Sequence, residues 1–135
     1  MSQGTGQGAP LARGLMLALL LAGAGCGKSG IAQSIASFKA SGHAVDEFKD
    51  TNAGALGAKK CQTGTIERLD VLLCDYASAE DAAQGQPAAE AWGANTGTVV
   101  VLHRKGTLFA VADRSHADPD GKIIAALSKT FRRAW

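Results

Sequence analysis

A short apolar run near the start of the chain constrains it most. Leu15–Ala22 is composed of Leu, Met and Ala, follows Arg13, and ends in the small residues Gly23–Gly25 before Cys26. A membrane-spanning helix needs about 20 apolar residues, so this run is too short to be retained as a span. A polar start, a short apolar centre and small residues before a cleavage point are typical of an export signal. We therefore expect residues 1–25 to be a signal peptide that is removed.

The end of this segment resembles the lipobox of bacterial lipoproteins, in which Leu, a small residue and Gly or Ala precede a Cys. Ala24 and Gly25 match the two positions before Cys26, and Gly23 stands where this family usually has Leu. The resemblance implies that the Cys26 thiol receives a diacylglycerol, that a peptidase cuts before it, and that the new amino terminus is often acylated. Two or three chains such as palmitate anchor firmly, because each buried methylene adds about 0.8 kcal/mol.

The resemblance also implies a location and a role. Lipoproteins of familiar bacteria remain at the inner membrane when an Asp follows the lipidated Cys, but here Gly27 follows Cys26. We therefore expect an anchor in the outer membrane, facing the periplasm, with the membrane itself as one partner. The remaining domain is expected to be non-enzymatic and to bind or support another protein of the cell envelope.

A second interpretation of the same segment stays open. Ala22–Ser29 fits the looser phosphate-loop pattern, in which Ala or Gly and four further residues precede Gly-Lys-Ser. In such a loop the backbone amides around Gly27 would cradle phosphates, Lys28 would neutralise them and Ser29 would ligate magnesium. The apolar segment Leu69–Asp75 would end in the second carboxylate. The alternative function is therefore a small cytoplasmic nucleotide-binding protein.

The length of the chain argues against a phosphate-loop domain. Each strand–helix–strand unit of such a domain takes about 30 residues or more, and several are needed, whereas the rest of this chain predicts hairpins. A third possibility is an exported chain without lipid, in which Cys26 is a spare thiol. No cofactor is predicted in the exported interpretations.

The other two cysteines predict a disulfide. A hairpin drawn through Gln62–Tyr76 with its turn at Glu67 and Arg68 places Cys61 opposite Cys74. Such cross-strand partners lie about 4.5 to 5.5 Å apart at their Cα atoms, which a disulfide can close, and an oxidising compartment preserves it. The alternative is two buried free thiols in a cytosolic core. No further Cys or His lies nearby in the sequence to complete a metal site.

The charges and the most polar cluster argue against three further classes, namely nucleic-acid binding, hydrolysis and calcium binding. The net charge is +2 with both signs interspersed, and Arg104-Lys105 and Arg132-Arg133 are too small for a nucleic-acid stripe. The most polar cluster invites a hydrolase interpretation, but triads are usually assembled from distant segments, so we expect helix capping here and no catalytic residues. The same cluster lacks the further ligands of a calcium loop. Its members are Asp113, Ser115, His116, Asp118 and Asp120.

The remaining pattern predicts a small α+β domain over residues 45–135, after a flexible tether at 26–44 that has room for a short helix. A loosely periodic helical region is expected from Val45 to Leu56. The later elements are a helix from Ser78 toward Trp92 that Gly85 and Pro87 divide, a hairpin of 98–103 and 107–112, and a last helix with Asp118 as N-cap. We expect a two-layer sandwich, in which a mainly antiparallel four-stranded sheet of two hairpins carries helices on one face.

Overall fold

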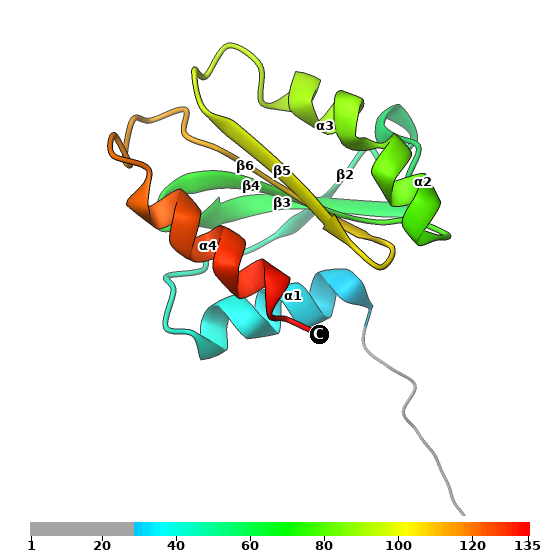
Figure 1. Cartoon of the computed structure of the whole chain (residues 1–135), viewed down its shortest axis with the longest axis horizontal. Coiled ribbons are helices and arrows are strands. Elements are labelled where there is room, and N and C mark those ends of the chain that lie inside the picture. Colours follow the sequence, from blue (N-terminus) through cyan, green and yellow to red (C-terminus); the bar gives the residue numbers. More distant parts are fainter. Residues whose placement is uncertain (1–28) are drawn as a thin grey trace, which may run out of the picture.

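Two hairpins lie side by side at the centre of the fold in this computed structural model, which describes residues 29–135 (Figure 1). The strands form one five-stranded sheet in the order β2-β3-β4-β6-β5, and every neighbouring pair is antiparallel. In chain order the elements are α1 (Gly30–Ala40), β2 (Lys49–Thr51), the 3₁₀ turn η3 (Gly54–Leu56), β3 (Lys60–Ile66), β4 (Leu69–Asp75), α2 (Ala79–Gln84), α3 (Gln86–Trp92), β5 (Val99–Arg104), β6 (Thr107–Ala112) and α4 (Lys122–Arg132).

Both predicted hairpins are confirmed. In the first, β3 pairs with β4 so that Cys61 lies opposite Cys74, and the turn falls at Glu67 and Arg68. These two turn residues have φ values of 52° and 68°, the left-handed conformation that two-residue hairpin turns require. In the second hairpin β5 pairs with β6, and Lys105 occupies the turn with a φ of 56°.

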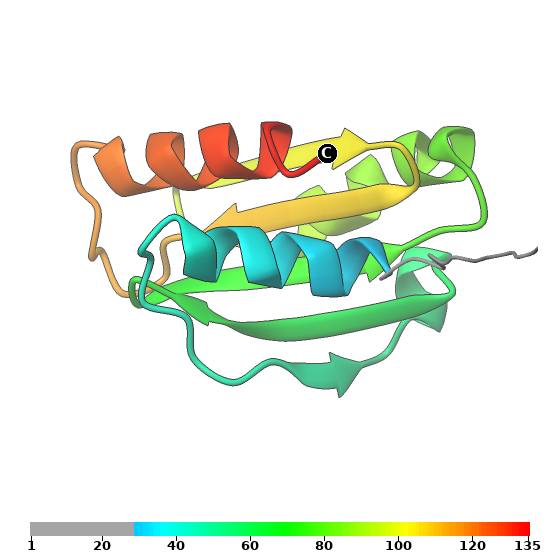
Figure 2. The same ribbon diagram turned by 90° about the horizontal axis from the view of Figure 1, so that it is seen from below.

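The predicted α+β fold on an antiparallel sheet is confirmed, but helices cover both faces of the sheet rather than one. Figures 1 and 2 show α1 and α4 on one face and α2 and α3 on the other. The reason lies in β4 and β6, which are apolar at successive positions. Val71 and Leu73 face the first pair of helices, whereas Leu72 and Cys74 face the second pair. A strand that is apolar on both sides must be covered on both sides.

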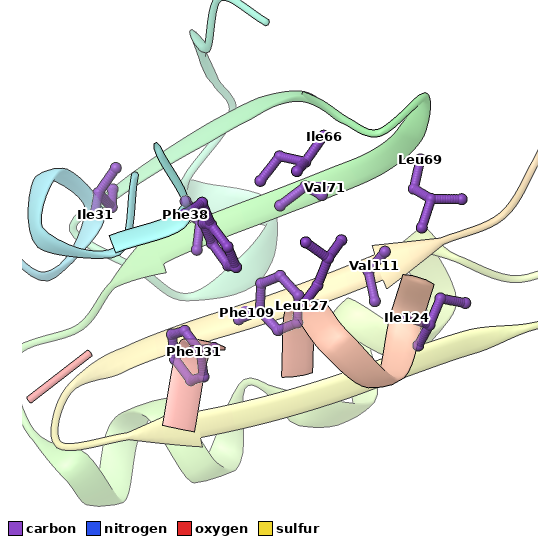
Figure 3. Packing of buried hydrophobic residues seen from close by; sticks show 11 residues of the cluster. Ile31, Phe38, Ile66, Leu69, Val71, Phe109, Val111, Ile124, Leu127 and Phe131 are labelled. Atoms are coloured by element: carbon purple, nitrogen blue, oxygen red, sulfur yellow. The ribbon is translucent and has the colours of Figure 1, made fainter. Parts of the chain in front are cut away.

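The larger core lies between the sheet and the pair α1 and α4 (Figure 3). Three phenylalanines form its centre. The Phe38 and Phe109 rings are 5.5 Å apart at their centroids, and Phe109 and Phe131 are 5.1 Å apart. All three side chains are fully buried, and burial of each such side chain stabilises the fold by about 1.5 to 3 kcal/mol. One residue from each of α1, β6 and α4 thus joins three distant segments.

The short helix for which the predicted tether at 26–44 left room is present as α1, but residues 30–40 pack into the core and do not form a flexible tether. Ile31, Ser34 and Phe38 are buried on one side of this helix, at the spacing of three and four residues that aligns side chains on one face. The Ser34 hydroxyl donates to the Gly30 carbonyl at 2.7 Å, so this polar group is satisfied inside the helix. The domain therefore includes α1 and begins well before residue 45.

The helical region predicted for Val45–Leu56 is also wrong. This segment forms β2 and η3 instead, with Asp50 of β2 opposite Gln62 of β3. One side of β3 pairs with β4, and its other side offers backbone groups that pair with β2, although the three residues of β2 are all exposed. β2 is therefore the fifth strand of the sheet. Gly57, at a φ of 68°, ends η3.

The helix predicted after Ser78 is confirmed together with its division. The Ser78 hydroxyl accepts the backbone N–H of Asp81 at 3.1 Å, as an N-cap residue does. Gly85 ends α2 and begins α3, with Pro87 in the first turn of α3. The Tyr76 ring lies so close to Gly85 that an added Cβ would be 2.1 Å from the phenol oxygen. A residue with a side chain would therefore not fit at the junction.

Candidate functional site

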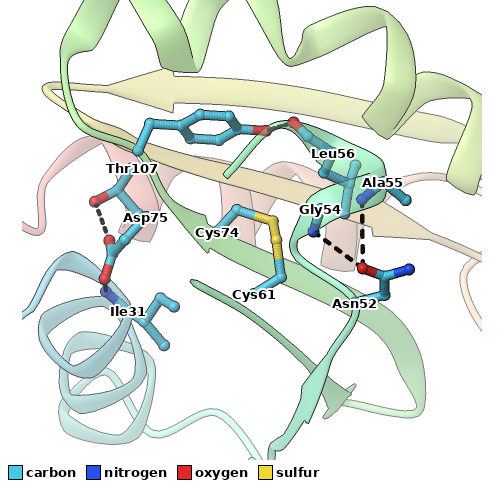
Figure 4. Close-up of a disulfide and its surroundings, with 10 residues drawn as sticks. Ile31, Asn52, Gly54, Ala55, Leu56, Cys61, Cys74, Asp75 and Thr107 are labelled. Carbon is cyan, nitrogen blue, oxygen red and sulfur yellow. Dashed lines mark hydrogen bonds between the residues drawn. A yellow bond between two sulfur atoms is a disulfide. The ribbon is translucent and has the colours of Figure 1, made fainter. Parts of the chain in front are cut away.

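A disulfide joins Cys61 of β3 to Cys74 of β4, as the sequence predicted (Figure 4). Their Cα atoms are 4.1 Å apart, and both side chains are almost fully buried on the face that α2 and α3 cover. Tyr76 follows on the same face and donates its hydroxyl to the Leu56 carbonyl at 2.8 Å. Burial raises the pKa of Tyr76 above its ordinary value. The disulfide joins the two strands of the hairpin, and the Tyr76 hydrogen bond attaches η3 to it.

The start of α1 meets the end of β4 and the start of β6. Asp75 accepts the Thr107 hydroxyl at 3.0 Å, and the backbone N–H of Ile31 donates to the other carboxylate oxygen at 3.5 Å (Figure 4). An acidic side chain stabilises a helix N-terminus, where the backbone N–H groups carry partial positive charge. Gly30 is packed so closely here that an added Cβ would lie 1.7 Å from the Thr107 hydroxyl oxygen.

The residues of the two rival interpretations lie mostly outside the described part of the chain. Cys26, Gly27 and Lys28 precede residue 29, so their predicted roles stay predictions. Ser29 is exposed, and its hydroxyl accepts the backbone N–H of Ala32 at 3.1 Å, which makes it the N-cap of α1. Asp75, the second carboxylate of the phosphate-loop interpretation, does lie beside this helix start.

The acidic cluster after β6 binds backbone groups. Asp113 accepts the backbone N–H groups of Ala117 at 2.8 Å and Asp118 at 2.9 Å. Asp118 in turn accepts those of Ile123 at 3.0 Å and Ile124 at 2.8 Å. Burial acts to raise the pKa of Asp118, but its hydrogen bonds with Ile124, Ile123, Asp120 and Lys122 together outweigh burial and lower the pKa below its ordinary value. The two carboxylates therefore order the loop and then the first turn of α4.

The last helix begins later than predicted, and the prediction that Asp118 is its N-cap residue is wrong. Asp118 binds the first turn of α4 from outside the N-cap position, because the chain turns once more before the helix starts at Lys122. Gly121 occupies the N-cap position with a φ of 76°. This left-handed conformation favours glycine.

The other members of the cluster are not assembled into a Ser–His–Asp arrangement. The Ser115 hydroxyl donates to the Arg68 carbonyl at 3.3 Å, on the neighbouring hairpin turn. His116 is exposed with a φ of 57°, and Asp120 lies 3.8 Å from the Lys122 ammonium. Of these three residues, Asp120 contacts the start of α4, where its carboxylate accepts the backbone N–H of Lys122 at 3.3 Å.

One polar hollow was not predicted. It lies beside α3, over the part of the sheet that α2 and α3 leave uncovered, and has a volume of about 340 Å³. The Arg114 guanidinium lies 4.6 Å from the centroid of the Trp92 ring and donates to Asp70 at 3.1 Å. Arg114 is 22 residues from Trp92 and 44 from Asp70 in the sequence, so no local pattern could have indicated the cluster. The hollow is lined by Thr51, Thr63, Gly64, Thr65, Asp70, Trp92 and Arg114.

A second polar hollow, of about 380 Å³, separates the end of α1 from α4. His43 lies within it, 3.3 Å from the Thr130 hydroxyl and 3.6 Å from the Glu67 carboxylate. The imidazole thus joins the loop after α1 to α4 and to the β3–β4 turn.

Residues 29–135 bring together no group of three His, Cys, Asp or Glu side chains that could hold a metal ion. In the same part of the chain, every helix is too short or too polar to cross a membrane. No protein family, curated protein or solved structure matches the chain in the comparisons with known proteins.

Proposed function

We propose that this chain is an exported, lipid-anchored protein of the cell envelope, whose domain binds or supports another envelope component without catalysing a reaction. The observation that carries the proposal is the disulfide between Cys61 and Cys74. Disulfides persist in oxidising compartments and are rare in the reducing cytosol. The signal-like residues 1–25 would deliver the domain to such a compartment, and Cys26 would carry the lipid.

The contacts of the polar cluster support a role in binding or structure. The carboxylates of Asp113 and Asp118 are committed to backbone N–H groups, and the Ser115 hydroxyl to the Arg68 carbonyl. Groups held in this way stabilise a loop, and they are not free to act as a nucleophile and its base.

The decisive experiment is the intact mass of the mature protein from the membrane fraction. We expect a chain that begins at Cys26 and carries added acyl mass. A Cys26→Ala variant should lose both the added mass and the membrane attachment. A matched variant, Cys61→Ala with Cys74→Ala, removes the other two cysteines and should keep both. A soluble wild-type protein that still begins near Met1 would reject the proposal.

A second candidate function, nucleotide binding through Gly27, Lys28 and Ser29, has one observation in its favour. Asp75 lies at the start of α1, where a phosphate loop places its magnesium-associated carboxylate. Two observations weigh against it. The Asp75 oxygens already accept hydrogen bonds from Thr107 and Ile31, and all pairings among the described strands are antiparallel, whereas phosphate-loop domains use parallel strands.

Thermal unfolding with and without magnesium and ATP or GTP tests this second candidate. A ligand at 100 times its dissociation constant would stabilise the fold by about 2.7 kcal/mol. Under the leading proposal we expect no change. Stabilisation of the wild type that a Lys28→Ala variant loses would favour the nucleotide-binding protein instead.

A further inference from the structure

The start of α1 and the end of α4 lie at the same end of the sheet. Lys60, Asp75, Thr107 and Arg104 are successive cross-strand partners and form the last row of the sheet. The start of α1 contacts Asp75 and Thr107 in this row. The end of α4 reaches the same row, because the Arg104 guanidinium donates to the Arg132 carbonyl. We call this end of the domain the entry end.

The entry end is rich in basic side chains. Its acidic residues are fewer. Asp75 lies in the last row, Glu80 and Asp81 are exposed at the start of α2 next to the β5–β6 turn, and the Asp50 carboxylate lies 4.0 Å from the Lys60 ammonium. The basic side chains are Lys59, Lys60, Arg104, Lys105, Arg132 and Arg133, and all but Arg104 are exposed.

At the opposite end of the sheet, acidic residues outnumber basic residues. It contains the segment before β2, the β3–β4 turn and the loop between β6 and α4. Its acidic residues are Asp46, Glu47, Glu67, Asp70, Asp113, Asp118 and Asp120, and its basic residues are Arg68, Arg114 and Lys122. The domain is therefore polarised along the strands, with positive charge at the entry end.

The distance from Cys26 to the domain is short. Gly30 already belongs to α1, and each residue of an extended chain spans at most about 3.6 Å, so four residues span about 14 Å. A lipid on Cys26 would therefore hold the entry end close to the membrane surface. We infer that the entry end lies against the anionic headgroups of that membrane. This inference rests on the proposed function.

Charge complementarity and one aromatic residue support this orientation. A basic residue near an anionic membrane surface strengthens its attraction about fivefold. Trp135 lies at the same end, because the Ala134 carbonyl accepts the side-chain amide of Gln33 in α1. Its ring is half-buried against Phe131, with the ring centroids 5.3 Å apart. Tryptophan is enriched where proteins meet the headgroup region of a membrane.

The two tryptophans of the chain provide the test. Trp135 marks the entry end, whereas Trp92 lies beside Arg114, near the opposite end. The acylated protein is placed in vesicles of phosphatidylglycerol and phosphatidylcholine that carry a nitroxide-labelled headgroup lipid. In the Trp92→Phe variant, emission from Trp135 should be quenched at least twice as strongly as emission from Trp92 in the Trp135→Phe variant. Equal quenching, or stronger quenching of Trp92, would overturn the inference.

A charge-reversal pair separates headgroup attraction from tethering alone. Lys105→Glu with Arg133→Glu reverses two charges at the entry end, and Arg68→Glu with Lys122→Glu reverses two at the opposite end. In the Trp92→Phe background, the first pair should lower quenching of Trp135 at least twofold, and the second should leave it unchanged. Equal effects of both pairs would overturn the inference. Circular dichroism checks that each variant is folded.

The mass of the same protein sample separates the two proposals. An unacylated chain whose Trp135 is still quenched on anionic vesicles would reject the lipid anchor and support the lipid-facing end. An acylated chain whose two tryptophans are quenched equally would reject the orientation and leave the anchor standing.

Discussion

Cys61 and Cys74 face each other across the β3–β4 hairpin with their Cα atoms 4.1 Å apart. The bond closes a segment with a sequence separation of 13, and closing a loop of about this length stabilises a fold by about 3 kcal/mol. We expect the double variant Cys61→Ala with Cys74→Ala to lose that amount in urea unfolding. Reductant should lower the midpoint of the wild type and leave the double variant unchanged. Equal urea midpoints for the wild type and the double variant in the absence of reductant would contradict the prediction.

Asp118 should make the stability of the domain depend on pH in the acidic range. Its pKa is lowered in the folded protein, so the stabilisation it provides is present above the unfolded-state pKa of about 3.9 and is lost as the pH falls through the folded-state value. Asp118→Asn should flatten the loss of stability below about pH 4. Asp118→Ala should also cost about 1 kcal/mol at neutral pH, because two backbone N–H groups of α4 lose their acceptor. Unfolding curves measured from about pH 2 to about pH 7 test both effects. An Asp118→Asn curve parallel to that of the wild type would contradict the assignment.

Tyr76 should limit stability in alkali. Burial raises its pKa in the folded protein, so its contribution is present below the unfolded-state pKa of about 10 and is lost as the pH rises through the folded-state value. Tyr76→Phe should remove this alkaline loss and cost about 1 kcal/mol at neutral pH, since the Leu56 carbonyl loses its donor. Urea midpoints at several pH values test both effects, and an unchanged midpoint at neutral pH would contradict the second.

Gly30 should tolerate no larger residue. An added Cβ would lie 1.7 Å from the Thr107 hydroxyl oxygen and 2.8 Å from Asp75, so Gly30→Ala must displace α1 from the sheet. Overpacking of this kind costs about 1 to 3 kcal/mol. Gly54→Ala is the matched control, because its nearest atom is an exposed side-chain oxygen at 3.3 Å. Urea unfolding compares the two, and equal stability would show that the helix start is not tightly packed.

The hairpins could be predicted because their information is local. Alternating positions, a two-residue turn and a pair of cysteines determine the register of Cys61 and Cys74. The exposed segment Lys49–Thr51 gave no such signal, since an edge strand with three exposed residues has no buried face to create a pattern. Its position depends on the free backbone of β3, which no property of its own side chains reveals.

The errors in the helices have different causes. α1 lies in a region rich in Gly, Ser and Ala, and its apolar residues share a core with residues from distant segments, among them β4, β6 and α4. The covering of both sheet faces did have a signal in the sequence. Val71–Cys74 and Leu108–Ala112 are apolar without alternation, which indicates strands that are buried on both sides. Of the candidate site, the sequence predicted the disulfide, whereas the Arg114 cluster depends on contacts between distant segments.

The contact of α1 with α4 also affects the order in which the domain can form. Gln33 and Ala134 are joined by a hydrogen bond across 101 residues of sequence, and Phe38 reaches the core only when Phe109 and Phe131 are present. Contacts of such long range form late in folding, because a long loop must close before they give any stability. The chain must therefore be nearly complete before its first described helix can dock. Until then the apolar side of α1 stays exposed to chaperones and proteases.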